Sequence, residues 1–196
     1  MQTEQKKPYR TPGEIDISKD GVDYINIYSN ATTELGRIMS HFSHTPFTHP
    51  YFGYFVSMEG YWYYMRAREK DDRLRYLFGF KAKKDGRELE PRWYPEFRED
   101  ILAANYQKII QTPGLKQLFM ESELPFTHFY VFANNKTTAK SAGMRSKPAK
   151  IVIFPREAEW LIDGLEDIRQ ALKEDRVPEC WARAELRYCS NVTDAT

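Results

Sequence analysis

Hydrophobic and polar positions along the chain predict a few short strands. Residues 24–28 alternate apolar and polar side chains and include β-branched residues, which is typical of a short strand. Residues 126–132 and 150–154 are rich in rings or β-branched side chains, and we expect strands there too. Residues 30–56 carry Thr, Ser, His, Pro and Gly with scattered rings, which favours an ordered loop.

Other segments show the three-to-four-residue apolar spacing of helices. Ser57 is the expected N-cap of one of them, with Glu59 in its first turn. A stripe of Phe97, Ile101, Ala104 and Ile109 marks the buried face of another helix, which Pro95 and Glu96 open. The helices predicted are 57–68, 71–84, the one opened by Pro95, one opened by Thr112 and Pro113, and a last long one from Pro155 to about Lys173.

The balance of elements predicts an α+β fold, predominantly helical, with a small β-sheet. A chain of 196 residues is long enough to bury a core of its own. We expect one compact domain over residues 21–175. A polar N-terminal extension, 1–20, precedes it, and a C-terminal tail, 176–196, comes after it.

Composition adds two features to this picture. The formal net charge is only +1, which argues against a dedicated electrostatic nucleic-acid binder. Rings make up 15% of the residues, so either the core is packed with them or some line a site that stacks on a flat ligand. Charge is uneven, because residues 134–150 hold five bases and no acid. This stretch is either a solvated surface or a loop that closes over phosphate.

Several classes of protein are excluded by simple features. The polar, charged start lacks the apolar segment of a signal peptide, and no apolar run approaches a membrane span, so we expect no membrane partner. Cys180 and Cys189 lack metal-ligand spacing, which favours a reduced, cytoplasmic protein. His41, His44 and His49 lie within nine residues but have no nearby Cys. We therefore expect no metal and no other cofactor.

Two short motifs carry a family resemblance. The first is Ser40-His41-Phe42 with Pro46-Phe47, and the second is Ser57-Met58-Glu59 followed by Gly60 and two aromatic residues. Together they resemble the YbiA-like, or NADAR (NAD and ADP-ribose), superfamily, with looser agreement over about residues 24–174. His41 stands where that family usually has Asn, and Gly60 where it usually has His.

The resemblance implies an activity. Members of the superfamily cleave N-glycosidic bonds, and their described substrates include phosphoribosyl intermediates of riboflavin synthesis and ADP-ribose attached to guanine. Related proteins are associated with phage–bacterium conflict. The resemblance thus implies the same type of bond here and does not choose the substrate.

Glu59 is the expected catalytic residue. Cleavage of a ribosyl C–N bond passes through an oxocarbenium-like transition state, which an adjacent carboxylate stabilises while it orients or deprotonates water. Burial among rings would raise the pKa of Glu59 towards a useful range. The alternative is that Glu59 only caps its helix.

Residues around these motifs are the expected substrate contacts. Rings of Phe42, Trp62 and Trp93 could stack on a base or ribose, or could simply pack in the core. His41 could donate to a ribose hydroxyl or phosphate, or could be a satisfied histidine that packs within its loop. Lys81 and Lys83, with Arg37 beside the first motif, could hold phosphate, with surface solvation as the alternative. The predicted substrate-binding residues are His41, Phe42, Trp62, Lys81, Trp93 and Arg37.

The sequence therefore predicts a metal-independent hydrolase that cleaves the N-glycosidic bond of an ADP-ribosyl or ribose-phosphate compound. Its expected partner is a nucleotide or ADP-ribose-containing small molecule, or ADP-ribosylated nucleic acid. The alternative is a catalytically inactive nucleotide-binding module that sequesters a signal or acts by protein–protein contact in phage–host conflict. A nucleic-acid role would have to come through residues 134–150.

Overall fold

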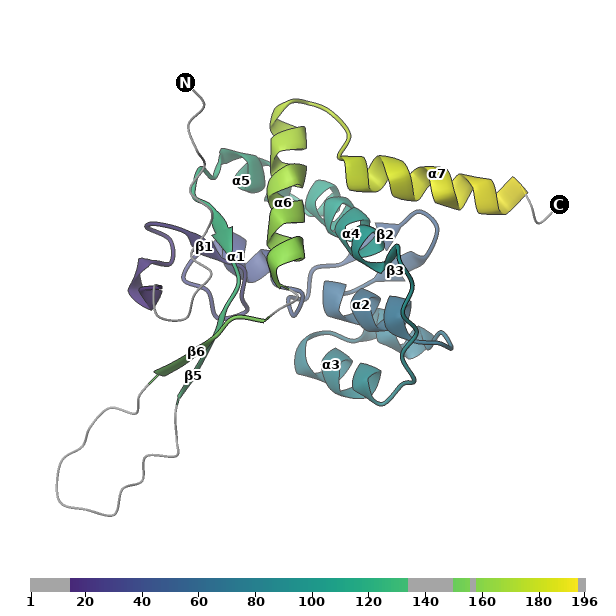
Figure 1. The fold of residues 1–196 in the computed structure, drawn as a ribbon, viewed down its shortest axis with the longest axis horizontal. Helices are drawn as coiled ribbons and strands as arrows, with labels where there is room; N and C mark the ends of the chain where they lie inside the picture. The colour runs from purple at the N-terminus through teal and green to yellow at the C-terminus, as the bar shows by residue number, and fades with distance from the viewer. Residues whose placement is uncertain (1–14, 134–149, 156–157, 194–196) are drawn as a thin grey trace, which may run out of the picture.

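The computed structural model of the chain describes residues 15–133, 150–155 and 158–193 (Figure 1). Helices dominate these ranges and the sheets are small, so the predicted α+β, mostly helical class is confirmed. The helices are α1 (Glu34–Met39), α2 (Met58–Arg66), α3 (Gly79–Arg87), α4 (Phe97–Gln111), α5 (Leu115–Glu121), α6 (Ala158–Lys173) and α7 (Glu179–Thr193), with the short 3-10 helices η1 (Ile17–Lys19) and η2 (Asp72–Tyr76).

The described strands form three separate pairs. They are β1 (Ile25–Asn26) parallel to β4 (Phe126–Thr127), β2 (Phe47–His49) antiparallel to β3 (Gly53–Phe55), and β5 (Tyr130–Ala133) antiparallel to β6 (Lys150–Ile153). The parallel pair spans the longest stretch of sequence, because it joins segments about a hundred residues apart. It brings the chain after β1 beside the chain after β4, where Ile27 and His128 are hydrogen bonded.

Helix α4 is the centre of the core. It packs against α2, α5, α6, α7 and β2, and in Figure 1 it lies beside α6 in the middle of the molecule. The predicted stripe of Phe97, Ile101, Ala104 and Ile109 is buried, as its spacing indicates. The polar Lys108 of the same helix is also fully buried, and its ammonium donates to the end of α1 and to the chain after it.

The prediction of a loop over residues 30–56 is wrong. This segment contains α1 and the β2–β3 hairpin. Thr33 caps α1, since its side chain accepts a hydrogen bond from the Gly36 amide. In the hairpin, Phe47 lies opposite Phe55 and both are buried. These elements are too short for an apolar periodicity to stand out among the polar residues around them.

The single helix predicted over residues 71–84 is two helices. Helix η2 ends at Tyr76, and α3 begins at Gly79. Between them Leu77 and Phe78 are extended, and Gly79 has a positive φ of 56°, which glycine adopts without steric cost. The break turns the chain so that α3 packs against α2.

The C-terminal tail predicted over 176–196 is also wrong, because most of it is α7. This helix packs along α4 (Figure 1), where Trp181 and Ala184 are buried. Arg187 of α7 makes ion pairs with Glu99 and Asp100 of α4. The helix was detectable, since Trp181, Ala184 and Tyr188 have helical spacing after Pro178.

Other boundaries differ by a few residues. Helix α2 ends at Arg66 rather than near Arg68, and α5 begins at Leu115 with Gly114 as its N-cap. Residues 15–20 of the predicted N-terminal extension include η1, whereas 1–14 and nearly all of the basic stretch 134–150 lie outside the described residues. Within the described ranges, no helix combines the length and apolar character that crossing a membrane would require.

Candidate functional site

Helix α2 begins at the predicted cap and carries Glu59 in its first turn. The Ser57 hydroxyl accepts from the Gly60 amide at 3.0 Å and donates to the Leu77 carbonyl at 2.8 Å. The cap is therefore confirmed, and it also ties the start of α2 to the chain before α3. The Glu59 amide donates to the His41 carbonyl at 2.9 Å. These bonds fix the backbone on both sides of the carboxylate.

Two glycines bring α2 and its neighbours into close contact. A Cβ at Gly60 would lie 2.3 Å from the Leu74 carbonyl oxygen, so no side chain fits beside Glu59 at this position. A Cβ at Gly86 of α3 would lie 2.2 Å from the Tyr63 ring. The close packing of α3 on α2 sets two basic residues of α3 beside the cavity that Glu59 lines.

A cavity of about 310 Å³ lies at this junction. Its walls come from α2, α3, the start of α6, and the segments that follow β1, α1 and β4. Five of the residues predicted for the site line it: His41, Phe42, Glu59, Trp62 and Trp93. Although they come from three separate stretches of sequence, the structure brings them together. Among the described residues that line the cavity, Glu59 is the one acid.

The structure does not bring Lys81 and Arg37 to this cavity. The Lys81 side chain is 70% exposed and lies 3.8 Å from the Asp85 carboxylate. The Arg37 guanidinium instead donates to the carbonyls of Ala31 and Thr32, at 3.0 and 2.8 Å. Neither residue is in the cavity wall. Lys83 does line the cavity, and its ammonium lies 5.3 Å from the centre of the Phe42 ring.

The environment of Glu59 raises its pKa from 4.5 to about 7. Burial is the main cause, since the residue is only 9% exposed, while the charges of Lys83 and Arg87 oppose the rise. A carboxylate in a first helical turn gains only about 0.3–1 kcal/mol from the helix dipole, which is less than one pKa unit. Burial therefore outweighs the favourable position, and the group is poised between its two protonation states near pH 7.

Helix α4 holds the segment that carries His41. The Lys108 ammonium is fully buried and donates to the Ile38 and Ser40 carbonyls, at 2.5 and 3.3 Å, and to the Ser43 hydroxyl at 3.1 Å. Burial lowers the pKa of Lys108 to about 7. Together with the bond between the Glu59 amide and the His41 carbonyl, these contacts connect α4 to the cavity wall through one short segment.

Other residues of the cavity wall were missed by the sequence reasoning, notably Tyr63, Arg66, Arg87, His128 and Tyr130. Tyr63 and Arg66 were within reach, because residues four and seven positions after Glu59 share its helix face. The Arg66 guanidinium lies 4.8 Å from the Trp93 ring, whose residue is 64% exposed. His128 and Tyr130 carry no such signal, since only the fold brings their segment to Glu59.

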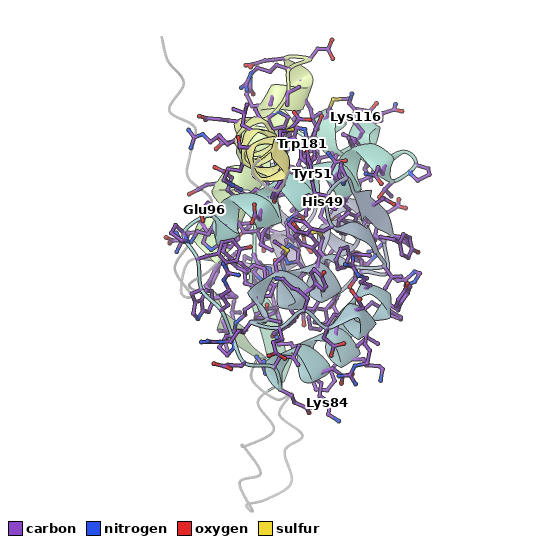
Figure 2. The ribbon with its side chains drawn as sticks, turned by 90° about the vertical axis from the view of Figure 1, so that its right-hand side faces the viewer. His49, Tyr51, Lys84, Glu96, Lys116 and Trp181 are labelled. Carbon is purple, nitrogen blue, oxygen red and sulfur yellow. The ribbon has the colours of Figure 1, made fainter. Side chains whose placement is uncertain are left out.

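The other histidines of the first motif region lie elsewhere. His44 is exposed and contacts Phe78, and His49 is fully buried beneath α7, where Figure 2 shows it beside Tyr51 and Trp181. Within the described residues, no three His, Cys, Asp or Glu side chains gather closely enough to hold a metal ion. We call the rings around His49 the His49 cluster; its members are His49, Tyr51, Phe52, Tyr61, Trp181 and Tyr188.

No protein-family model, curated protein or solved structure matches this chain. The resemblance to the YbiA-like superfamily consequently rests on the motifs around His41 and Glu59. What the cavity can do chemically depends on its own residues: one carboxylate with a raised pKa, several rings, two neutral histidines and three basic side chains.

Proposed function

We propose that this protein hydrolyses the N-glycosidic bond of a ribose-phosphate or ADP-ribosyl compound in the cavity beside Glu59. The observation that carries the proposal is the buried Glu59 carboxylate, with a pKa of about 7, in a ring-lined cavity. A volume of about 310 Å³ is within the range of small-molecule sites. The motif resemblance to N-glycosidases supports the same chemistry.

The basic and the aromatic side chains of the cavity suit the two parts of such a substrate. Arg66, Lys83 and Arg87 supply positive charge from neighbouring turns of α2 and α3, which suits phosphate oxygens. Phe42 and Trp62 offer ring faces or edges to a base or ribose. Lys83 lies against the Phe42 ring, so a basic and an aromatic side chain are neighbours there.

In the proposed reaction the bond between C1′ of the ribose and the nitrogen of the base breaks. Its electron pair leaves with the nitrogen, and the Glu59 carboxylate stabilises the positive charge that develops on the ribose. Water then bonds to C1′ and gives a proton to Glu59, and one proton is returned to the departed nitrogen. The products are a free ribose hydroxyl and the neutral base with a hydrogen on that nitrogen; from NAD, whose nicotinamide nitrogen leaves already neutral, this proton passes to the solvent, so atoms and charge balance with water as the one co-reactant.

The test is turnover by the full chain and by a variant of Glu59. The protein is incubated with ADP-ribosylated guanosine, NAD and a phosphoribosylaminopyrimidine, and released base is measured by chromatography with mass detection. We expect turnover of at least one compound, and a loss of about 100-fold or more in kcat for Glu59→Gln. Because the carboxylate must be ionised, kcat/KM should rise with pH through about 7 and then level off.

A matched control is Glu34→Gln, which makes the same change in the first turn of α1, at an exposed residue outside the cavity. It should turn over like the wild type. Absence of turnover on all three compounds, or full turnover by Glu59→Gln, would contradict the proposed reaction.

The alternative, a nucleotide-binding module without catalysis, is favoured by one observation. Three basic side chains in one cavity wall need only an anionic ligand, and they say nothing about bond cleavage. Calorimetric binding of ADP-ribose that survives Glu59→Gln, with no product from the wild type, would support this alternative.

A further inference from the structure

Two histidines from distant parts of the chain line the same cavity wall. His41 follows α1, and His128 lies between β4 and β5. Burial lowers the pKa of both rings, that of His41 to about 3, so both are neutral near pH 7. The charge that His128 would carry when protonated also disfavours protonation of His41, and both residues line the one cavity. A neutral imidazole has one nitrogen that donates and one that accepts, and its partners decide which is which.

Asn105 determines which nitrogen of the His41 ring carries the proton. The Asn105 amide nitrogen lies 2.9 Å from the Ile101 carbonyl, which can only accept, so the NH₂ group must face that side. The same nitrogen lies 3.3 Å from His41 Nε2. Since an NH₂ group only donates, His41 Nε2 is the accepting nitrogen. The proton of His41 therefore sits on Nδ1, and the ring offers an N–H donor at its other edge.

The main-chain carbonyl of Ile27 determines which nitrogen of the His128 ring carries the proton. Its Nδ1 lies 2.5 Å from the Ile27 carbonyl oxygen. A carbonyl cannot donate, so Nδ1 carries the proton and Nε2 is a bare acceptor. Neither His128 Nε2 nor His41 Nδ1 has a hydrogen-bond partner among the described residues, and neither is a fully enclosed polar atom. Both residues line the cavity, and the nitrogens that their described partners leave free are thus of opposite character.

We propose that His41 and His128 act as a fixed donor–acceptor pair that recognises neighbouring hydroxyl groups of the ribose. The proposal deepens the proposed function and rests on it, because it presumes a ribose-containing ligand in this cavity. His41 Nδ1–H donates to one hydroxyl oxygen, and His128 Nε2 accepts from the other hydroxyl. An ionised phosphate oxygen could not donate to His128, and an ammonium could not accept from His41. The pair therefore suits a vicinal diol, and the phosphate is left to the basic side chains.

The first test is the protonation of the rings themselves. Two-dimensional NMR of the imidazole nitrogens, in isotope-labelled full chain, distinguishes protonated from bare nitrogens in each of the four histidines. We expect Nδ1–H with bare Nε2 for both His41 and His128. His49 serves as an internal reference of the other kind, since its Nδ1 faces the Tyr51 and Phe52 amides and must accept. A protonated Nε2 on His41 or His128 would overturn the proposal, whatever the activity.

The second test is discrimination between two ligands that differ by one hydroxyl. Ribose 5-phosphate is the part shared by both proposed substrate classes, and 2-deoxyribose 5-phosphate lacks one of its hydroxyls. By calorimetry, the wild type should bind ribose 5-phosphate at least about tenfold more tightly. His128→Phe keeps a ring against Tyr130 but removes the acceptor, and it should weaken the binding of ribose 5-phosphate about tenfold; where His128 is the partner of the 2-hydroxyl, the ratio of the two Kd values also falls close to one.

The matched control is His44→Phe, which changes a histidine outside the cavity and should keep the wild-type ratio. Equal binding of the two sugars by the wild type, or no binding of ribose 5-phosphate, would overturn the proposal. A protein that discriminates the sugars but cleaves nothing would refute only the proposed reaction. A protein that cleaves ribosyl and deoxyribosyl bonds equally well would refute only the histidine pair.

Discussion

The molecule contains two clusters of aromatic rings, each around a histidine. One cluster buries its histidine, and the other lines a cavity. The rings around His49 bury it completely, and α7 contributes Trp181 and Tyr188 to its cover, although Tyr51 at the edge of the cluster is partly exposed. Around His41 the rings leave a cavity of about 310 Å³. Helix α2 contributes to both, because Tyr61 stacks on His49 while Trp62 contacts His41. Adjacent residues on a helix point about a quarter-turn apart, so one helix serves both clusters.

The difference lies in what covers each cluster. Tyr188 and Arg187 of α7 both bind the buried Asp100 carboxylate of α4, so the cover of the His49 cluster is held by an ion pair and a hydrogen bond. No described element covers the cavity in the same way, and Trp93 at its wall stays exposed. A high content of rings therefore stabilises the fold in one place and lines a candidate site in the other.

The largest expected effect compares two tryptophans. Trp181→Ala removes a buried ring from the His49 cluster, and it should lower the free energy of unfolding by about 3–5 kcal/mol. Trp93→Ala removes an exposed ring at the cavity and should cost less than about 1 kcal/mol, while it weakens ligand binding. Urea unfolding followed by circular dichroism measures both. Equal losses in the free energy of unfolding for the two variants would contradict the view that rings stabilise the fold at His49 but not at the cavity.

The next prediction concerns the pH dependence that Glu59 imposes on stability. Its folded-state pKa of about 7 lies above the unfolded value, so burial of Glu59 costs nothing below about pH 4.5, the cost grows as pH rises from about 4.5 to 7, and it is complete above about pH 7. The full cost is about 3 kcal/mol. Glu59→Gln should therefore be more stable than wild type by about that amount at pH 8 and similar to it at pH 4. Thermal or urea unfolding at both pH values gives the difference, and a pH-independent difference would argue against a buried carboxyl.

His49 should impose a pH dependence of stability opposite in sign to that of Glu59. Burial lowers its pKa to about 4, below the unfolded value, so its contribution is fully present above about pH 6.5 and is lost as pH falls towards 4. The loss is again about 3 kcal/mol. His49→Phe keeps a ring and should remove this part of the acid sensitivity. The wild type and the variant are compared by urea unfolding at pH 7 and pH 4. If both lost stability in parallel, His49 would not be a source of acid sensitivity.

The smallest effect is expected at the cap that starts α2. Ser57→Ala removes the acceptor for the Gly60 amide and the donor to the Leu77 carbonyl, and should cost about 1 kcal/mol. Because the cap lies next to Glu59, we also expect kcat to fall by more than the roughly fivefold factor that about 1 kcal/mol corresponds to. Ser43→Ala, which loses hydroxyl bonds on the other side of the cavity segment, gives a comparison of similar size. An unchanged free energy of unfolding for Ser57→Ala would show that the cap is not needed.

The sequence predicted the features that depend on local spacing. The Ser57 cap and the stripe from Phe97 to Ile109 follow from single helical turns, and the structure has both. It predicted less well where elements are only a few residues long, as in α1 and the β2–β3 hairpin, because so short a segment has no clear period. Helix α7 is a different case, because its helical apolar spacing is present in the sequence although a tail was predicted there.

By itself, then, the sequence determined the fold class, the start of α2 and a group of residues around Glu59 that the structure brings together. Tertiary structure decided which basic residues reach the cavity, because the break at Gly79 sets where α3 packs and takes Lys83, but not Lys81, to the cavity wall. It also brought His128 to the cavity through the parallel β1–β4 pair. The reason is physical: local spacing records which face of an element is apolar, whereas a site depends on where several such elements meet.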